Sequence, residues 1–301
     1  MTALRKTMEI EGKSAVVTGG GNGIGRAICL ALAAKGANVA VADIELEAAE
    51  AVAAEVASSG VRSLARQVDV AVEEEVQALA DAAWAVFGSV EILVNNAGVM
   101  HATKPLWETT TDEFDWCFAV NVRGVSNGIR AFVPRFAASD QPAWILNTGS
   151  EHSLGVPHLF GGLYTATKHA LLGLSDVLRR ELPDHVGVTV LCPGLVESTL
   201  WRASERRQAA FGGTEAPNEA GAAAMKLGMP AEEVAQSAIA AVEAGSFLAI
   251  SHAHVIDYAD ERWAEIRDAC AAQAPRSPGD DQYKLDVVIE KLMSQNRGDQ
   301  A

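Results

Sequence analysis

Short apolar runs alternate with longer segments of helical periodicity along most of the first 250 residues. The first run, "SAVVT" at 14–18, is rich in β-branched residues and closed by glycine, which is typical of a buried strand. The segment 24–35 follows with helical periodicity and stops at Gly36, a residue type that often ends helices. The same alternation predicts further strands at 38–44, 61–70, 90–98, 143–150, 187–194 and 246–250, and further helices at 45–59, 72–87, 112–138, 162–182 and 230–243.

This order of elements predicts the fold class. Strands alternating with helices form βαβ units with right-handed crossovers, which build a parallel sheet. The strands are apolar on both faces, as a sheet covered on both sides requires. We expect an α/β, doubly wound parallel sheet in three α/β/α layers. It forms a single domain over 1–270, with a helical segment at 198–229 that caps a pocket, and 271–301 is a C-terminal extension. The helix at 112–138 has room for a break near Pro134.

Charge and cysteine usage exclude several classes of protein. The chain has 39 acidic and 24 Lys+Arg residues, a net charge of −15, and no basic cluster. Nucleic acid and anionic membrane surfaces would be repelled. The four cysteines are scattered without a CxxC pair, as in a cytoplasmic protein with reduced thiols. The N-terminus lacks the apolar core of a signal peptide, and no apolar run is long enough to cross a membrane, so we expect a cytoplasmic location.

Five glycines lie within residues 19–25, between the first predicted strand and the first predicted helix. At such a turn, main-chain N–H groups and the positive helix end can face a pyrophosphate. The spacing is G-x-x-x-G-x-G, with Gly19 for the turn, Gly23 for close approach and Gly25 for helix packing. Asn22 and Ile24 belong to the same cradle. A glycine-rich turn that binds nothing is the alternative interpretation.

A carboxylate at the end of the second strand supports the dinucleotide interpretation. Asp43 stands 20 residues after Gly23, where it can accept hydrogen bonds from the adenosine ribose hydroxyls. Its charge would repel the additional phosphate of NADP. The sequence therefore predicts NAD, with NADP less favoured.

Several motifs in a fixed order resemble those of the short-chain dehydrogenase/reductase family, in its shorter single-domain branch. They are "TGGGNGIG", "DV" at 69–70, "NNAG", Asn121, "NTGS", "YTATK" and "PG", and the resemblance covers about residues 12–242. It implies a Rossmann-like fold and an NAD(P)-dependent oxidoreductase acting on CH–OH groups. It also implies that Asn95 helps to hold the loop below the coenzyme. The coenzyme contacts that it implies are Asp69, Val70, Asn96, Ala97, Gly98, Pro193, Gly194, Val196 and Ser198.

Tyr164 and Lys168 are four residues apart on a predicted helix and share one of its faces. A lysine ammonium and a cationic nicotinamide would stabilise the phenolate, so Tyr164 could take the proton of an alcohol while hydride leaves. Ser150 would hydrogen-bond the substrate oxygen, and Ser153 is the alternative serine. Lys168 would also hold the nicotinamide ribose, and Asn121 would hold a water that links Lys168 to bulk solvent. A lone YxxxK pair is more often a helix surface, but the glycine loop and Ser150 favour catalysis.

Candidate substrate contacts are fewer. His152 and His158 follow Ser150, Trp107 follows the fourth strand, and Trp201 follows "PG"; each could instead face solvent or pack. His252 and His254 share a strand face but have no evident third ligand, so we predict no metal site.

The predicted function is an NAD-dependent oxidoreductase interconverting a secondary alcohol and a ketone, on a small apolar or aromatic substrate. The segment 112–136 and the long C-terminus also resemble a subset of the family that oxidises benzylic alcohols of lignin-derived aryl ethers. The alternatives are an NADPH-dependent carbonyl or 3-oxoacyl reductase and a non-catalytic dinucleotide-binding sensor. The resemblance also implies a homo-oligomer, a tetramer or a dimer, paired through the predicted 112 and 162 helices.

Overall fold

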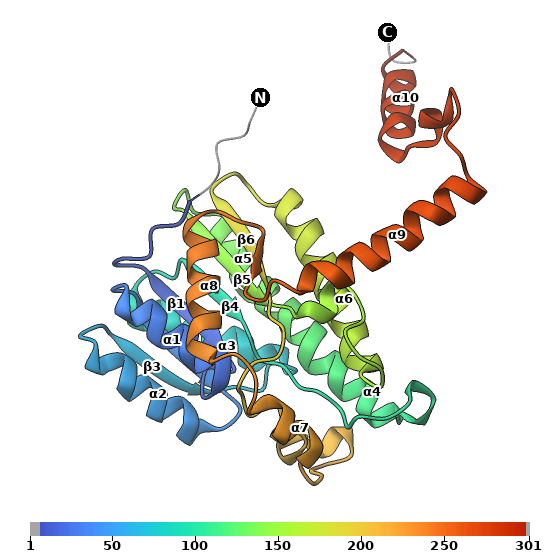
Figure 1. Ribbon diagram of the computed structural model, residues 1–301. Helices are drawn as coiled ribbons and strands as arrows, with labels where there is room; N and C mark the ends of the chain where they lie inside the picture. Colours follow the sequence, from blue (N-terminus) through green and yellow to red (C-terminus); the bar gives the residue numbers. More distant parts are fainter. Residues whose placement is uncertain (1–6, 299–301) are drawn as a thin grey trace. The chain divides into compact units, whose positions relative to one another are not determined.

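The computed structural model describes residues 7–298 and is built on a central parallel sheet (Figure 1). Within those residues seven strands hydrogen-bond in the order β3-β2-β1-β4-β5-β6-β7, and every neighbouring pair is parallel. The strands are β1 (Ser14–Thr18), β2 (Asn38–Asp43), β3 (Ser63–Gln67), β4 (Ile92–Asn95), β5 (Ala143–Thr148), β6 (Val186–Cys192) and β7 (Leu248–Ile250).

Helices cover both faces of this sheet (Figure 1). One buried cluster joins the sheet to α1 (Gly23–Ala34), α2 (Leu46–Ser58) and α8 (Ala231–Glu243). A second joins the opposite face to α3 (Glu73–Phe87), α4 (Thr111–Phe118), α5 (Gly124–Ala137) and α6 (Gly162–Glu181). The predicted doubly wound α/β/α architecture is confirmed.

The strand order reverses between β1 and β4. The chain winds outward from β1 to β3, then returns to β4 and winds the other way to β7. The loops that leave β1 and β4 therefore diverge, which opens a crevice at the carboxyl edge of the sheet. The glycine-rich loop at 19–25 and the loop after Asn95 both lie at that edge.

The helix predicted over 112–138 is interrupted, but not at Pro134. A π-helical turn, η2 (Ala119–Arg123), separates α4 from α5, and Pro134 lies inside α5. Proline is tolerated there because Arg130, whose carbonyl loses its helical donor, is exposed to water. The π turn carries Asn121, whose side chain bonds the main chain of Val99.

The segment after β6 is helical in short pieces, as predicted: η4 (Leu200–Arg206), η5 (Ala209–Phe211) and α7 (Glu219–Met225). The chain divides into two compact units, Met1–Tyr258 and Ala259–Ala301. Helix α9 (Val255–Gln273) was not predicted, and Val255 is its one buried residue. η6 (Asp280–Tyr283) and α10 (Leu285–Gly298) follow within the C-terminal extension. No helix in residues 7–298 has both the length and the apolar character that a membrane crossing needs.

Candidate active site

A cavity of about 790 Å³ opens at the carboxyl edge of the sheet. Its walls come from the glycine-rich loop, the ends of β2, β4, β5 and β6, the first turns of α6, and the segment 193–225. This volume lies within the range of sites that hold a cofactor or a drug-sized ligand. We refer to the segment 198–225 as the cap.

The glycine-rich loop has no room for side chains. A Cβ on Gly25 would stand 2.0 Å from the carbonyl oxygen of Gly19, and one on Gly19, whose φ is +60°, would stand 2.8 Å from Cα of Ala97. Below 3 Å neither contact is possible without moving backbone. The loop and the first turn of α1 line the cavity with main chain, which fits the pyrophosphate of a dinucleotide.

Asp43 lies at the end of β2, buried and lining the same cavity. Its Oδ2 accepts a hydrogen bond from the Gly21 amide at 2.9 Å, and its Oδ1 accepts one from the Glu45 amide at 3.1 Å. The carboxylate therefore holds the glycine-rich loop in place. Each oxygen keeps a lone pair, so ribose hydroxyls can still be accepted.

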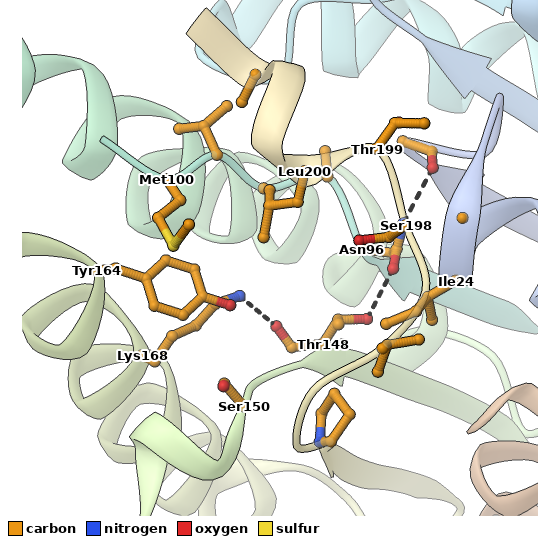
Figure 2. A pocket seen from close by; sticks show the side chains of 18 of the residues that line it. Ile24, Asn96, Met100, Thr148, Ser150, Tyr164, Lys168, Ser198, Thr199 and Leu200 are labelled. Atoms are coloured by element: carbon orange, nitrogen blue, oxygen red, sulfur yellow. Dashed lines mark hydrogen bonds between the residues drawn. The ribbon is translucent and has the colours of Figure 1, made fainter. Parts of the chain in front are cut away.

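Asn96 connects three strand ends, and its bond to Thr148 is drawn in Figure 2. Its Nδ2 donates to the carbonyl oxygens of Thr18 and Gly19 at 3.1 and 3.0 Å, and its Oδ1 accepts from Thr148 Oγ1 at 3.1 Å. Loops after β1, β4 and β5 are thus fixed to one another. Thr148 is a site residue that sequence reasoning missed, although it stands inside the quoted "NTGS". Asn95 lies below the cavity, where its Nδ2 bonds Asn147 Oδ1 at 2.9 Å.

Tyr164 and Lys168 project from α6 into the cavity beside Ser150, as Figure 2 shows. Lys168 Nζ lies 5.4 Å from the centroid of the Tyr164 ring and donates to the Thr148 carbonyl at 2.7 Å. Ser150 is buried, and its Oγ accepts from the His152 amide at 3.3 Å. The three predicted side chains are brought together.

Burial is the largest cause of the shifted pKa values of Tyr164 and Lys168. It raises the pKa of Tyr164 to about 12, although the hydrogen bond with Ser150 opposes it; the Glu151 carboxylate adds to the rise. Burial also lowers the pKa of Lys168 to about 8. The protein by itself therefore keeps the phenol neutral, and a further positive charge is needed to form the phenolate near neutral pH.

Ser153 does not line the cavity. It is buried beneath Ser150, and its Oγ accepts from the Ser150 amide at 3.2 Å. The geometry thus favours Ser150 over Ser153 as the serine that meets a ligand.

The role expected of Asn121, holding a water beside Lys168, stays a prediction. Asn121 is buried outside the cavity lining, and its Nδ2 donates to the Val99 carbonyl at 2.9 Å and to Thr167 Oγ1 at 3.0 Å. Its Oδ1 accepts from the Val99 amide at 2.8 Å. Both amide hydrogens are used by protein groups, so the side-chain nitrogen cannot also donate to a water. Asn121 acts as a positioning residue for the loop after β4.

The two histidines expected near substrate line the cavity. Burial, followed by the nearby His158, Lys168 and His169, lowers the pKa of His152 to about 3, so its ring is neutral. Its Nδ1 lies 2.7 Å from Thr165 Oγ1, and its ring stands edge-on to that of Tyr164 with the centroids 5.2 Å apart.

The two tryptophans proposed as pocket wall do not line the cavity. Trp107 is 84% exposed, and the neighbouring Leu106, itself 56% exposed, contacts Gly162. Trp201 lies within the cap, where Gly221 packs near its Cβ, and Leu200 faces the cavity instead.

The predicted coenzyme contacts all line the cavity: Gly19, Asn22, Gly23, Ile24, Gly25, Asp43, Asp69, Val70, Asn96, Ala97, Gly98, Pro193, Gly194, Val196 and Ser198.

His252 has a role that its sequence position did not indicate. Its Nδ1 accepts from the Gly194 amide and its Nε2 donates to the Leu195 carbonyl, both at 3.1 Å. An amide can only donate and a carbonyl can only accept, so this ring is neutral with its proton on Nε2. His254 instead pairs with Glu151 at 2.9 Å. Among residues 7–298 no group of three metal-ligating side chains occurs.

Comparison with known proteins identifies the family. The family model described as short chain dehydrogenase matches residues 13–209, more than half of the chain. The chain is a short-chain dehydrogenase. It is 29% identical to C alpha-dehydrogenase of Sphingobium sp. SYK-6 over 295 residues, covering 96% of this chain and 95% of that protein.

Two further relatives resemble this short-chain dehydrogenase. A 2,5-dichloro-2,5-cyclohexadiene-1,4-diol dehydrogenase of Sphingobium indicum is 38% identical over 194 residues, covering 64% of this chain and 76% of its own. A short chain dehydrogenase/reductase from Burkholderia phymatum, solved with NAD, is 31% identical. It superposes with a TM-score of 0.81 over 90% of this chain and 99% of its own. The predicted enzyme class, an oxidoreductase acting on alcohol groups, is confirmed.

Proposed function

We propose that this short-chain dehydrogenase oxidises a secondary alcohol to a ketone with NAD as its coenzyme, and reduces the ketone in the reverse direction. The observation that carries this is the meeting of Ser150, Tyr164 and Lys168 in one cavity whose other end holds Asp43. The reacting carbon would lie at the first group and the adenosine at Asp43, as in the crevice where this kind of sheet binds a dinucleotide.

Different residues of the chain would bind different parts of the coenzyme. The glycine-rich loop and the first turn of α1 meet the pyrophosphate with main-chain amides. Asp43 accepts the ribose hydroxyls at the adenosine end, where its charge disfavours a 2′-phosphate. Bound NAD supplies the hydride acceptor and a positive charge beside Tyr164.

Tyr164 takes the proton from the substrate hydroxyl. Its phenol is neutral in the free enzyme, so the base forms only when positive charge stands beside it. Lys168 carries an ammonium below about pH 8, is held in place by the Thr148 carbonyl, and would add to the positive charge that bound NAD supplies. Ser150 donates its hydroxyl proton to the substrate oxygen and so orients the reacting carbon.

The substrate end of the cavity favours an apolar ligand. Met100 and Leu200 lie near Tyr164 in Figure 2, and Pro157, Ala224 and Met225 line the same cavity. The full-length similarity to C alpha-dehydrogenase, and the ring-borne hydroxyls in the name of the diol dehydrogenase, support a cyclic or benzylic secondary alcohol.

A panel of benzylic, alicyclic and steroidal alcohols with NAD, followed by the absorbance of the reduced nicotinamide, tests this function. Tyr164→Phe should lower kcat by about 10³-fold while NADH still binds, because only the acid–base group is lost. Tyr283→Phe, at a 79% exposed tyrosine, is the matched control. Turnover that survives in Tyr164→Phe would remove Tyr164 from the mechanism.

We also propose that two or four copies assemble through α4 and α6. Phe114 on α4 is 46% exposed and stacks on Phe118, and Leu174 and Val177 on α6 are 38% and 53% exposed. Exposed apolar side chains gathered on two helices of one layer support an interface there. Light scattering of the purified chain tests it, and a monomer would refute it.

A further inference from the structure

The first half of the cap crosses the coenzyme side of the cavity. Thr199 Oγ1 donates to Asn22 Oδ1 at 2.6 Å, and Gln208 Nε2 donates to Asp69 Oδ2 at 2.7 Å. Between these two points Arg206 forms an ion pair with Glu45. Residues 199–208 therefore run from the glycine-rich loop toward the loop after β3, and Arg206 and Gln208 both line the cavity there.

Arg206 reaches the place where the adenosine ribose is expected. Its partner Glu45 lies two residues after Asp43, and the Glu45 amide donates to Asp43 Oδ1 at 3.1 Å. Arg206, Asp43 and Ile44 all line the cavity. The Arg206 side chain is 22% exposed and that of Glu45 is 46% exposed, so the pair lies at the mouth of the cavity.

We propose that Arg206 and Glu45 select the coenzyme together with Asp43. Glu45 neutralises Arg206 and keeps its guanidinium from binding a 2′-phosphate, so the site accepts NAD. This rests on the proposed function only in placing the coenzyme in this cavity. The specificity residue thus comes from the cap, 161 positions away in the sequence from the glutamate that it faces.

The charges support this assignment. Asp43, Glu45 and Arg206 together carry one net negative charge, which repels a 2′-phosphate. Without the Glu45 charge the sum becomes zero, and a guanidinium with five donors is free to bind phosphate. Arg26, in the first turns of α1, cannot take the place of Arg206 in binding a phosphate. Its guanidinium is already bonded to Glu55, by Nε at 3.1 Å and by Nη2 at 2.5 Å.

Gln208 fixes the backbone that delivers Arg206. Its amide nitrogen faces the Asp69 carboxylate, which can only accept, and its Oε1 is buried without a protein partner. Replacing Gln208 should loosen this part of the cap without changing its charge. Gln208→Ala is therefore the matched control, expected to weaken both coenzymes by the same factor.

The test measures dissociation constants of NADH and NADPH by quenching of tryptophan fluorescence in the full chain. The variants are Glu45→Gln, Glu45→Gln with Arg206→Gln, and Gln208→Ala. Glu45 provides no side-chain cap to α2, so the helix start is preserved. Glu45→Gln should tighten NADPH about tenfold relative to NADH, as one Coulomb contact at a partly exposed site allows. The double variant should lose this gain.

Two results would overturn the proposal. The first is that the ratio of the NADPH and NADH dissociation constants in Glu45→Gln differs from that of the parent by less than twofold. The other is a gain for NADPH that persists in the double variant, because the charge of Arg206 would then be irrelevant. Neither readout needs turnover, so an enzyme inactive on every alcohol would contradict the proposed reaction while leaving this measurement intact.

Discussion

Lys168→Met should make the protein more stable while abolishing its activity. The Lys168 ammonium is buried, and its pKa falls from the ordinary 10.5 to about 8. Each pKa unit corresponds to about 1.36 kcal/mol, so keeping this charge costs the folded state about 3 kcal/mol at pH 7. Methionine has a similar length and no charge, but it leaves the Thr148 carbonyl without its donor, a loss of about 1 kcal/mol.

The net expectation is a free energy of unfolding about 2 kcal/mol higher in Lys168→Met, or a Tm about 4 °C higher. Below pH 8 both folded and unfolded parent carry the ammonium, so the full cost is present. Between pH 8 and 10.5 the folded state loses its proton first, and the cost disappears. The advantage of the variant should therefore be largest at neutral pH and vanish by about pH 10.5.

Thermal and urea unfolding of both proteins at pH 7 and pH 10.5, followed by circular dichroism, measures this. Lys226→Met, at an exposed lysine, controls for the loss of a surface charge. A variant less stable than the parent at pH 7, or a difference that does not change with pH, would refute the claim that the site holds its ammonium at a cost.

Three other substitutions separate residues that meet ligands from those that do not. Ser150→Ala should lower kcat by about 10²-fold with little change in NADH affinity, as loss of one donor to a reacting oxygen does; an unchanged kcat would exclude Ser150 from the reaction. Gly25→Ala should abolish NADH binding, measured by fluorescence, because its Cβ would stand 2.0 Å from the Gly19 carbonyl oxygen. Trp107→Ala should change the free energy of unfolding by less than about 0.5 kcal/mol and leave kcat/KM unaltered, since the ring is 84% exposed; a large rise in KM would show that Trp107 contacts substrate.

Local patterns were sufficient to predict the sheet, its winding and the residues at the strand ends. Apolar runs closed by glycine mark buried strands, and the carboxyl ends of parallel strands meet at one edge, so Gly19, Asp43, Asn96 and Ser150 had to converge. Helix α6 placed Tyr164 beside Lys168 for the same kind of reason, a spacing of four residues.

The remaining features depend on contacts that no short window contains. Whether Pro134 or Asn121 interrupts the helix is decided by the Val99 main chain, which Asn121 bonds from 22 positions away. Trp107 faces solvent in the turn Leu106–Glu108, none of whose residues is buried. Arg206 and Gln208 reach the cavity, and His252 reaches the turn after β6, from beyond the last motif. Their partners lie 57 to 161 positions earlier in the sequence.

The bonds from His252 to Gly194 and Leu195 mean that the chain beyond β7 helps to shape the reaction site. Shortened versions of this enzyme should therefore be cut after Tyr258, where the first compact unit ends, and not directly after Ile250. The first cut keeps the imidazole that holds the turn after β6, whereas the second removes it along with the partner of Glu151.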